Sequence, residues 1–140
     1  MRHLSRHPVT RITRRQRALF ERLFKQVLHT LPAAARDLLQ TMPVAVDDYP
    51  SAEVQDEMDV AVDELFGLYT GTPATERSLE QVGVPEAVIH IYRLALLSDA
   101  MNRSGRVDQR RLRRQIRTTL LHELGHHHGF DEDKLDRLGY

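Results

Sequence analysis

The stretch from Val107 to His127 restricts the fold of this chain more than any other, because its apolar residues follow a helical repeat. Leucine or isoleucine recurs at every fourth position, and this spacing places the side chains on one face of a helix. The residues concerned are Leu112, Ile116, Leu120 and Leu124. The pattern predicts a long helix with one buried face, so the rest of the chain must supply a core for that face.

The segments before this helix are shorter and of both types. Apolar residues at three- and four-residue spacing predict a helix over residues 14–30, and Pro32 suits the start of a second short helix. Residues 51–64 predict a short acidic helix with a loop, and "DKLDRLG" (133–139) a last helix. Three strands are expected from β-branched and aromatic runs that are bounded by turn residues, at Val44–Asp47, 64–71 and Ala87–Tyr92.

This order of elements predicts a single α+β domain over residues 14–140, preceded by a flexible basic tail at residues 1–13. The chain of 140 residues suits one modest core. It has no apolar run long enough to span a membrane, and its N-terminus lacks the apolar centre of a secretory signal. We therefore expect a cytoplasmic protein.

Charge is unevenly distributed although the net charge is zero. Residues 1–31 and 103–117 are rich in arginine, and residues 47–64 carry acids without a base. Basic blocks of this kind can bind nucleic acid, but no aromatic or glycine-rich nucleic-acid motif accompanies them. We therefore interpret these blocks as solvated or mutually facing surfaces.

The sequence "HELGHHHGFDEDKL" (122–135), at the end of the long helix, contains the residues best suited to chemistry. His122 and His126 lie one helical turn apart, so both imidazoles can reach one cation. Glu123 points one step around the helix, where it can reach a water molecule bound to that cation. Because the chain has no cysteine, any metal site must use nitrogen and oxygen ligands. We predict one Zn²⁺ ion here.

Two imidazoles alone would hold zinc weakly, so a third protein ligand is expected, with one position left for water. Gly129 suits a left-handed helix end that turns the chain back. The carboxylates that follow it are the candidates for the third ligand, namely Asp131, Glu132 and Asp133.

The same stretch resembles the extended HExxHxxGxx(H/D) zinc signature of the small bacterial proteins that form the minimal zincin-like metallopeptidase family. "LFGLYTGTPATERS" (65–78) is similar to a strand and turn of that family, and "VPEAVIHIYRLAL" (84–96) to its third strand. The resemblance covers about residues 43–138. It implies a minimal zincin-like fold, in which a small mixed β-sheet packs against the zinc helix.

By resemblance, His122 and His126 are zinc ligands and Glu123 is the general base. The third ligand falls on Glu132, where the family more often has aspartate, and the neighbouring Asp131 competes for this role. The resemblance further implies a zinc-dependent peptidase that uses a metal-activated water on a peptide or protein substrate. It also implies that the substrate pairs with an edge strand near Ala87–Tyr92. Tyr92 and Arg93 are candidates for stabilising the oxyanion.

Two other functions stay open at this point. A domain this small can bind zinc for stability, or bind a peptide without cleaving it. A nucleic-acid-binding protein would use the arginines of residues 103–117, but would leave His122, Glu123 and His126 without a role. Of the remaining histidines, His90 is expected to be a residue of the sheet. His127 and His128 are expected beside the metal ligands or on the surface. The surface is also the expected place of His3, His7 and His29.

Overall fold

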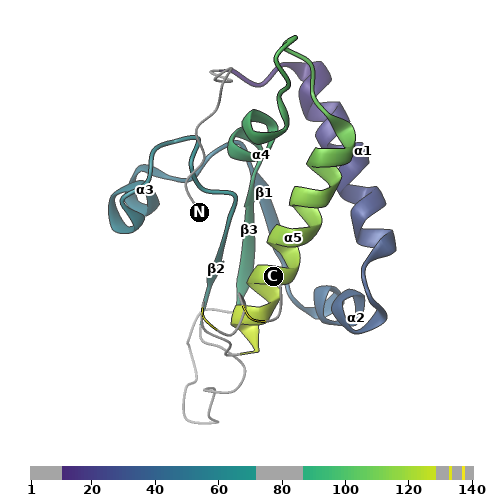
Figure 1. The fold of residues 1–140 in the computed structure, drawn as a ribbon. Helices are drawn as coiled ribbons and strands as arrows, with labels where there is room; N and C mark the ends of the chain where they lie inside the picture. Colours follow the sequence, from purple (N-terminus) through teal and green to yellow (C-terminus); the bar gives the residue numbers. More distant parts are fainter. Residues whose placement is uncertain (1–10, 72–86, 129–132, 134–136, 138–140) are drawn as a thin grey trace.

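Five helices and three strands make up the part of the chain that the computed structural model describes, which is residues 11–71, 87–128, 133 and 137. Figure 1 shows their arrangement. In chain order they are α1 (Arg14–Thr30), α2 (Ala33–Thr41), β1 (Val44–Asp47), α3 (Ala52–Met58), β2 (Gly67–Thr70), β3 (Val88–Tyr92), α4 (Arg93–Ala100) and α5 (Gln109–His127). The α+β class is confirmed, as are the helix at residues 14–30 and the strand Val44–Asp47.

Local capping explains where the two long helices begin. Thr13 precedes α1, and its hydroxyl accepts a hydrogen bond from the N–H of Gln16, whose side chain accepts one from the N–H of Thr13. Asp108 precedes α5 and accepts from the N–H of Arg111. These side chains satisfy N–H groups that have no partner inside their helices.

The sheet is mixed, with strand order β1-β3-β2. β1 runs parallel to β3, with Val44 opposite Ile89, and β2 runs antiparallel to it, with Gly67 opposite Ile91. The prediction that the edge strand lies near Ala87–Tyr92 is therefore wrong, because β3 is hydrogen-bonded on both sides. β1 and β3 are neighbours although far apart in the sequence, and local patterns do not reveal such pairing.

Helix α5 crosses one face of the sheet, and α1 lies alongside it (Figure 1). The predicted stripe on α5 is buried, since Leu112, Ile116 and Leu120 are all 0% exposed. They form one core with side chains of α1, the sheet and α4, among them Phe20, Leu23, Ile89, Ile91, Leu96 and Leu97. This shared core fixes α5 relative to the sheet.

Helix α4 follows β3 without a loop, and the sequence pattern predicted no helix after the strand that ends at Tyr92. All residues from Leu94 to Ala100 are buried. A helix that is buried all round has no polar face, so it lacks the periodic signal by which amphipathic helices are recognised. The short length of α4 adds to this ambiguity.

Several expectations concern residues outside the described ranges: the tail before Arg11, the turn at Gly129 and most of the helix at 133–139. The expected acidic helix within residues 51–64 is α3, which buries none of its residues. Among the helices that the structure describes, none combines the length and apolar character that a membrane crossing requires.

Candidate metal centre

The two histidines of the HExxH sequence lie side by side on α5. The ring centroids of His122 and His126 are 5.0 Å apart, and the ring planes are inclined by 77°. One ligand atom from each of His122, Glu123 and His126 can be chosen so that all three lie within 4.8 Å of one another. Imidazole nitrogens and a carboxylate oxygen are donors that suit Zn²⁺. The spacing and chemistry of this cluster therefore fit a zinc ion.

Glu123 is more deeply buried than its two neighbours, with 7% of its surface exposed, whereas both histidines are partly buried. It lies one turn after Thr119, on the same side of the helix. Thr119 touches the sheet at Gly67, so this side of α5 faces β2. Glu123 therefore lies on the side of α5 that faces strand β2.

Gly67 allows α5 to approach the sheet this closely. A Cβ atom at this position would lie 2.6 Å from Cγ2 of Thr119 and 2.9 Å from the carbonyl oxygen of His90, both of which are too short. The sequence analysis did not assign Gly67 a role. A glycine inside a strand, as in "LFGLYT", is a known sign of close backbone approach and could have identified it.

Tyr69, two residues further along β2, contacts the last turn of α5. Its hydroxyl lies 3.0 Å from Nδ1 of His127, and the two ring centroids are 5.8 Å apart. His127 is thus partly buried against an edge strand. His128 is the residue that caps the C-terminus of the helix, and its N–H donates to the carbonyls of Leu124 (3.2 Å) and Gly125 (3.1 Å). Sequence reasoning missed Tyr69, since nothing local connects residues so distant along the chain.

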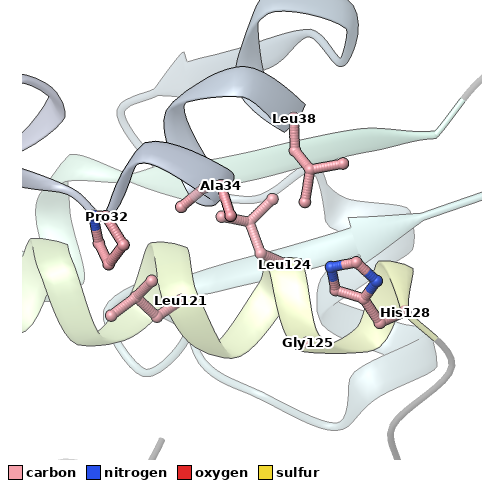
Figure 2. A pocket seen from close by; sticks show the side chains of 8 residues that line it. Pro32, Ala34, Leu38, Leu121, Leu124, Gly125 and His128 are labelled. Carbon is pink, nitrogen blue, oxygen red and sulfur yellow. The ribbon is translucent and has the colours of Figure 1, made fainter.

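The other flank of α5 lines an apolar cavity of about 180 Å³ between α2 and the end of α5. Figure 2 shows it, with the imidazole of His128 at one end and Leu38 of α2 across from it. It is lined by Leu121, Leu124 and Gly125 of α5 and by His128, which directly follows the helix. At 100° per residue, this flank lies about 130° around the helix axis from the midpoint of His122 and His126. The cavity and the histidine pair therefore lie on different sides of the helix.

Tyr92 lies on the opposite face of the sheet from α5. Ile91 is opposite Gly67 and shares its α5-facing side, so the next side chain points away. Tyr92 stacks on His90 with 6.3 Å between ring centroids, and Nε2 of His90 lies 3.1 Å from the hydroxyl oxygen of Thr70. Burial raises the pKa of Tyr92, and Asp47 and Glu123 add to this. His90 is a sheet residue, as expected.

Arg93, the second candidate for the oxyanion, binds elsewhere. Its Nη1 donates to Oδ1 of Asp48 over 2.9 Å, and its guanidinium carbon lies 5.9 Å from the ring centroid of Phe20. Asp48 also pairs with Arg17 of α1. Arg93 therefore joins α4 to α1 and to the end of β1.

Part of the arginine block at residues 103–117 also serves the fold. Arg111 binds the buried Asp99, and Nη1 of Arg117 donates to the carbonyl of Thr30 over 3.0 Å. Such contacts give these arginines a role within the domain that needs no nucleic acid.

Asp131 and Glu132, the two candidates for the third ligand, lie outside the described residues, so the identity of that ligand stays a prediction. His122, Glu123 and His126 form the one cluster of three or more metal-binding side chains within the described ranges.

Comparison with known proteins connects this site to a family. No curated protein matches the chain. A family model described as zincin-like metallopeptidase matches residues 39–140, which include the sheet, α5 and the histidine pair. Because the match covers most of the chain, this protein belongs to the zincin-like metallopeptidase family.

Proposed function

We propose that this protein is a zinc-dependent peptidase in which His122 and His126 bind one Zn²⁺ ion and Glu123 is the general base. The observation that carries the proposal is the cluster of these three side chains on α5, with ligand atoms within 4.8 Å of one another. Family membership supports the reaction class. Glu132 is the proposed third ligand, with Asp131 as the alternative.

When bound, zinc would supply a Lewis acid that lowers the pKa of a coordinated water and polarises a carbonyl. Glu123 would accept the proton of the attacking water and hold it at a carboxylate oxygen. It would then deliver this proton to the departing amine. The burial of Glu123, which is 7% exposed, limits the access of bulk water to that proton.

The edge strand β2 is the proposed binding site for a peptide backbone. In the described part of the sheet, β2 pairs with β3 along one side, which leaves the other for strand addition. Thr119, which touches β2, lies about 40° around the helix from the midpoint of His122 and His126. A peptide along this edge would therefore pass close to the histidine pair. This replaces the expectation that β3 binds the substrate.

The test combines metal analysis with one conservative substitution. Glu123→Gln keeps the size of the side chain but cannot accept a proton, so we expect peptide hydrolysis to fall about 10²- to 10⁴-fold. Zinc content, measured by elemental analysis after purification without chelators, should stay the same. Glu57→Gln on the exposed helix α3 is the matched control and should keep full activity. Undiminished hydrolysis by zinc-loaded Glu123→Gln would exclude Glu123 as the base.

A zinc-binding domain without peptidase activity is the alternative. The same protein distinguishes the two functions when a broad peptide library is combined with thermal unfolding. Stabilisation by zinc without cleavage of any peptide would favour this alternative. Zinc-dependent cleavage would favour the peptidase.

A further inference from the structure

We propose that Tyr69 is a positioning residue for the zinc site, which holds the last turn of α5, and with it His126, against strand β2. This inference rests on the proposed function, because it concerns the geometry of the same site. It assigns a role to a strand residue that binds no metal itself.

The last turn of α5 needs support from outside the helix. α5 ends at His127, so His126 lies in its final turn. The last carbonyls of a helix have no partner within it, and terminal turns open at little cost in free energy. The N–H of His128 satisfies the carbonyls of Leu124 and Gly125, but this bond lies within the same turn. A ligand in such a turn keeps its position only if tertiary contacts fix it.

Tyr69 provides such a contact from a strand that is itself held in the sheet. It is opposite Ile89 of the central strand, and its ring packs against the core. Its hydroxyl reaches Nδ1 of His127 at 3.0 Å. His127 follows His126 directly, so fixing the ring of one restrains the backbone that carries the other.

The same strand also fixes α5 before the site. Gly67 allows close contact with Thr119, three residues before His122. The contacts of β2 with Thr119 and His127 therefore lie on either side of the HExxH turns. Together they set both the rotation of α5 about its axis and its position along the strand. Loss of the second contact is expected to weaken the restraint on the end that carries His126.

The measurement is the affinity for zinc, by competition with a chromophoric chelator at a temperature at which each variant is fully folded. Tyr69→Phe removes only the hydroxyl, and we expect the dissociation constant to rise about tenfold, as for loss of other groups that orient metal ligands. Tyr49→Phe is the matched control, because Tyr49 is 55% exposed, and should bind zinc like the wild type. The visible spectrum of bound Co²⁺ should change in Tyr69→Phe alone, because it reports ligand geometry rather than stability.

A double-mutant cycle tests whether Tyr69 acts through His127. His127→Asn should weaken zinc binding to a similar degree, and the double variant should bind no more weakly than either single variant. Additive losses would show that Tyr69 does not act through His127, and would overturn the inference. A dissociation constant within about twofold of wild type in Tyr69→Phe would also overturn it, because loss of groups that orient metal ligands typically weakens metal binding about 10- to 100-fold. Absence of zinc binding by the wild type would overturn the proposed function as well.

Discussion

Two buried carboxylates lie near opposite ends of α5, one contacting the helix and one belonging to it, and their surroundings differ. Asp99 is 6% exposed and Glu123 is 7% exposed. Asp99 meets the first turn, where Arg111 donates from Nε to Oδ2 over 3.0 Å and from Nη2 to Oδ1 over 2.9 Å. Glu123 lies in the final turns, beside two imidazoles whose nitrogens can share a cation with it.

The comparison shows that burial alone does not mark a functional carboxylate. A guanidinium carries a permanent charge and fits a carboxylate through two parallel hydrogen bonds, so the Asp99–Arg111 pair is complete in itself. Imidazole nitrogens can instead bind a divalent cation from solution. The chemistry of the neighbours therefore assigns Asp99 to the fold and Glu123 to the site.

The largest expected effect on stability comes from substitution of Asp99, and the same measurement on Glu123 allows a direct comparison. Asp99→Asn removes the buried anion that pairs with the partly exposed guanidinium of Arg111, and we expect the free energy of unfolding to fall by about 3 kcal/mol. Glu123→Gln in metal-free protein should lower it by less than about 1 kcal/mol, because functional groups are seldom optimised for stability. Urea unfolding measures both. Equal losses would make Glu123 a structural carboxylate and remove the distinction.

Substitution of both partners sharpens the same test. Asp99→Asn combined with Arg111→Met removes both charges of the pair, so neither partner is left without its counterion. The double variant should be more stable than Asp99→Asn alone. If it is less stable, the pair does not account for the burial of Asp99.

Addition of zinc tests the opposite end of α5. A ligand that binds only the folded chain raises the free energy of unfolding by about 2.7 kcal/mol at a free concentration one hundred times its dissociation constant. Chelation should reverse this effect, and His122→Ala should abolish it. The same stabilisation in His122→Ala would place the bound zinc elsewhere.

The close contact between β2 and α5 is expected to have a slightly smaller effect. Gly67→Ala introduces a Cβ that lies 2.6 Å from Cγ2 of Thr119, and we expect a loss of about 2 kcal/mol from overpacking. Thr119→Ser removes that methyl group but keeps the hydroxyl that donates to the carbonyl of Gln115. The double variant should recover part of the loss, since the contact with the His90 carbonyl persists. No recovery would locate the strain at His90.

The smallest expected effect concerns Asp48, a partly exposed counterpart of Asp99. The hydrogen bond from Arg17 lowers the pKa of Asp48, and Arg93 adds to this. Because this pKa is lower in the folded than in the unfolded chain, the pair stabilises the protein above about pH 4. The stabilisation is lost as pH falls through the folded-state value.

Asp48→Asn should therefore cost about 1 kcal/mol at pH 7, since solvent screens the pair. This difference from wild type should shrink towards zero in acid unfolding measured below pH 3. A difference that is independent of pH would mean that the charge of Asp48 contributes nothing.

Periodic sequence patterns were enough to predict those helices and strands that have one apolar and one polar face. The repeat from Leu112 to Leu124 predicted a buried stripe, and the alternation at Val44–Asp47 predicted β1. The spacing of His122 and His126 predicted their proximity, because helix geometry alone fixes side chains one turn apart. Helix α4 was not predicted, because all its sides are buried and no polar face reveals the helical period.

The sequence by itself determined the helical HExxH cluster, because that cluster depends on residues close together in the chain. It also determined the family, since the match over residues 39–140 rests on sequence alone. Tertiary structure alone decided the strand order, the sheet edge beside α5, and the contacts of Gly67 and Tyr69 with α5. These features join segments tens of residues apart. Such pairing depends on how separate faces share one core, a property that no local pattern encodes.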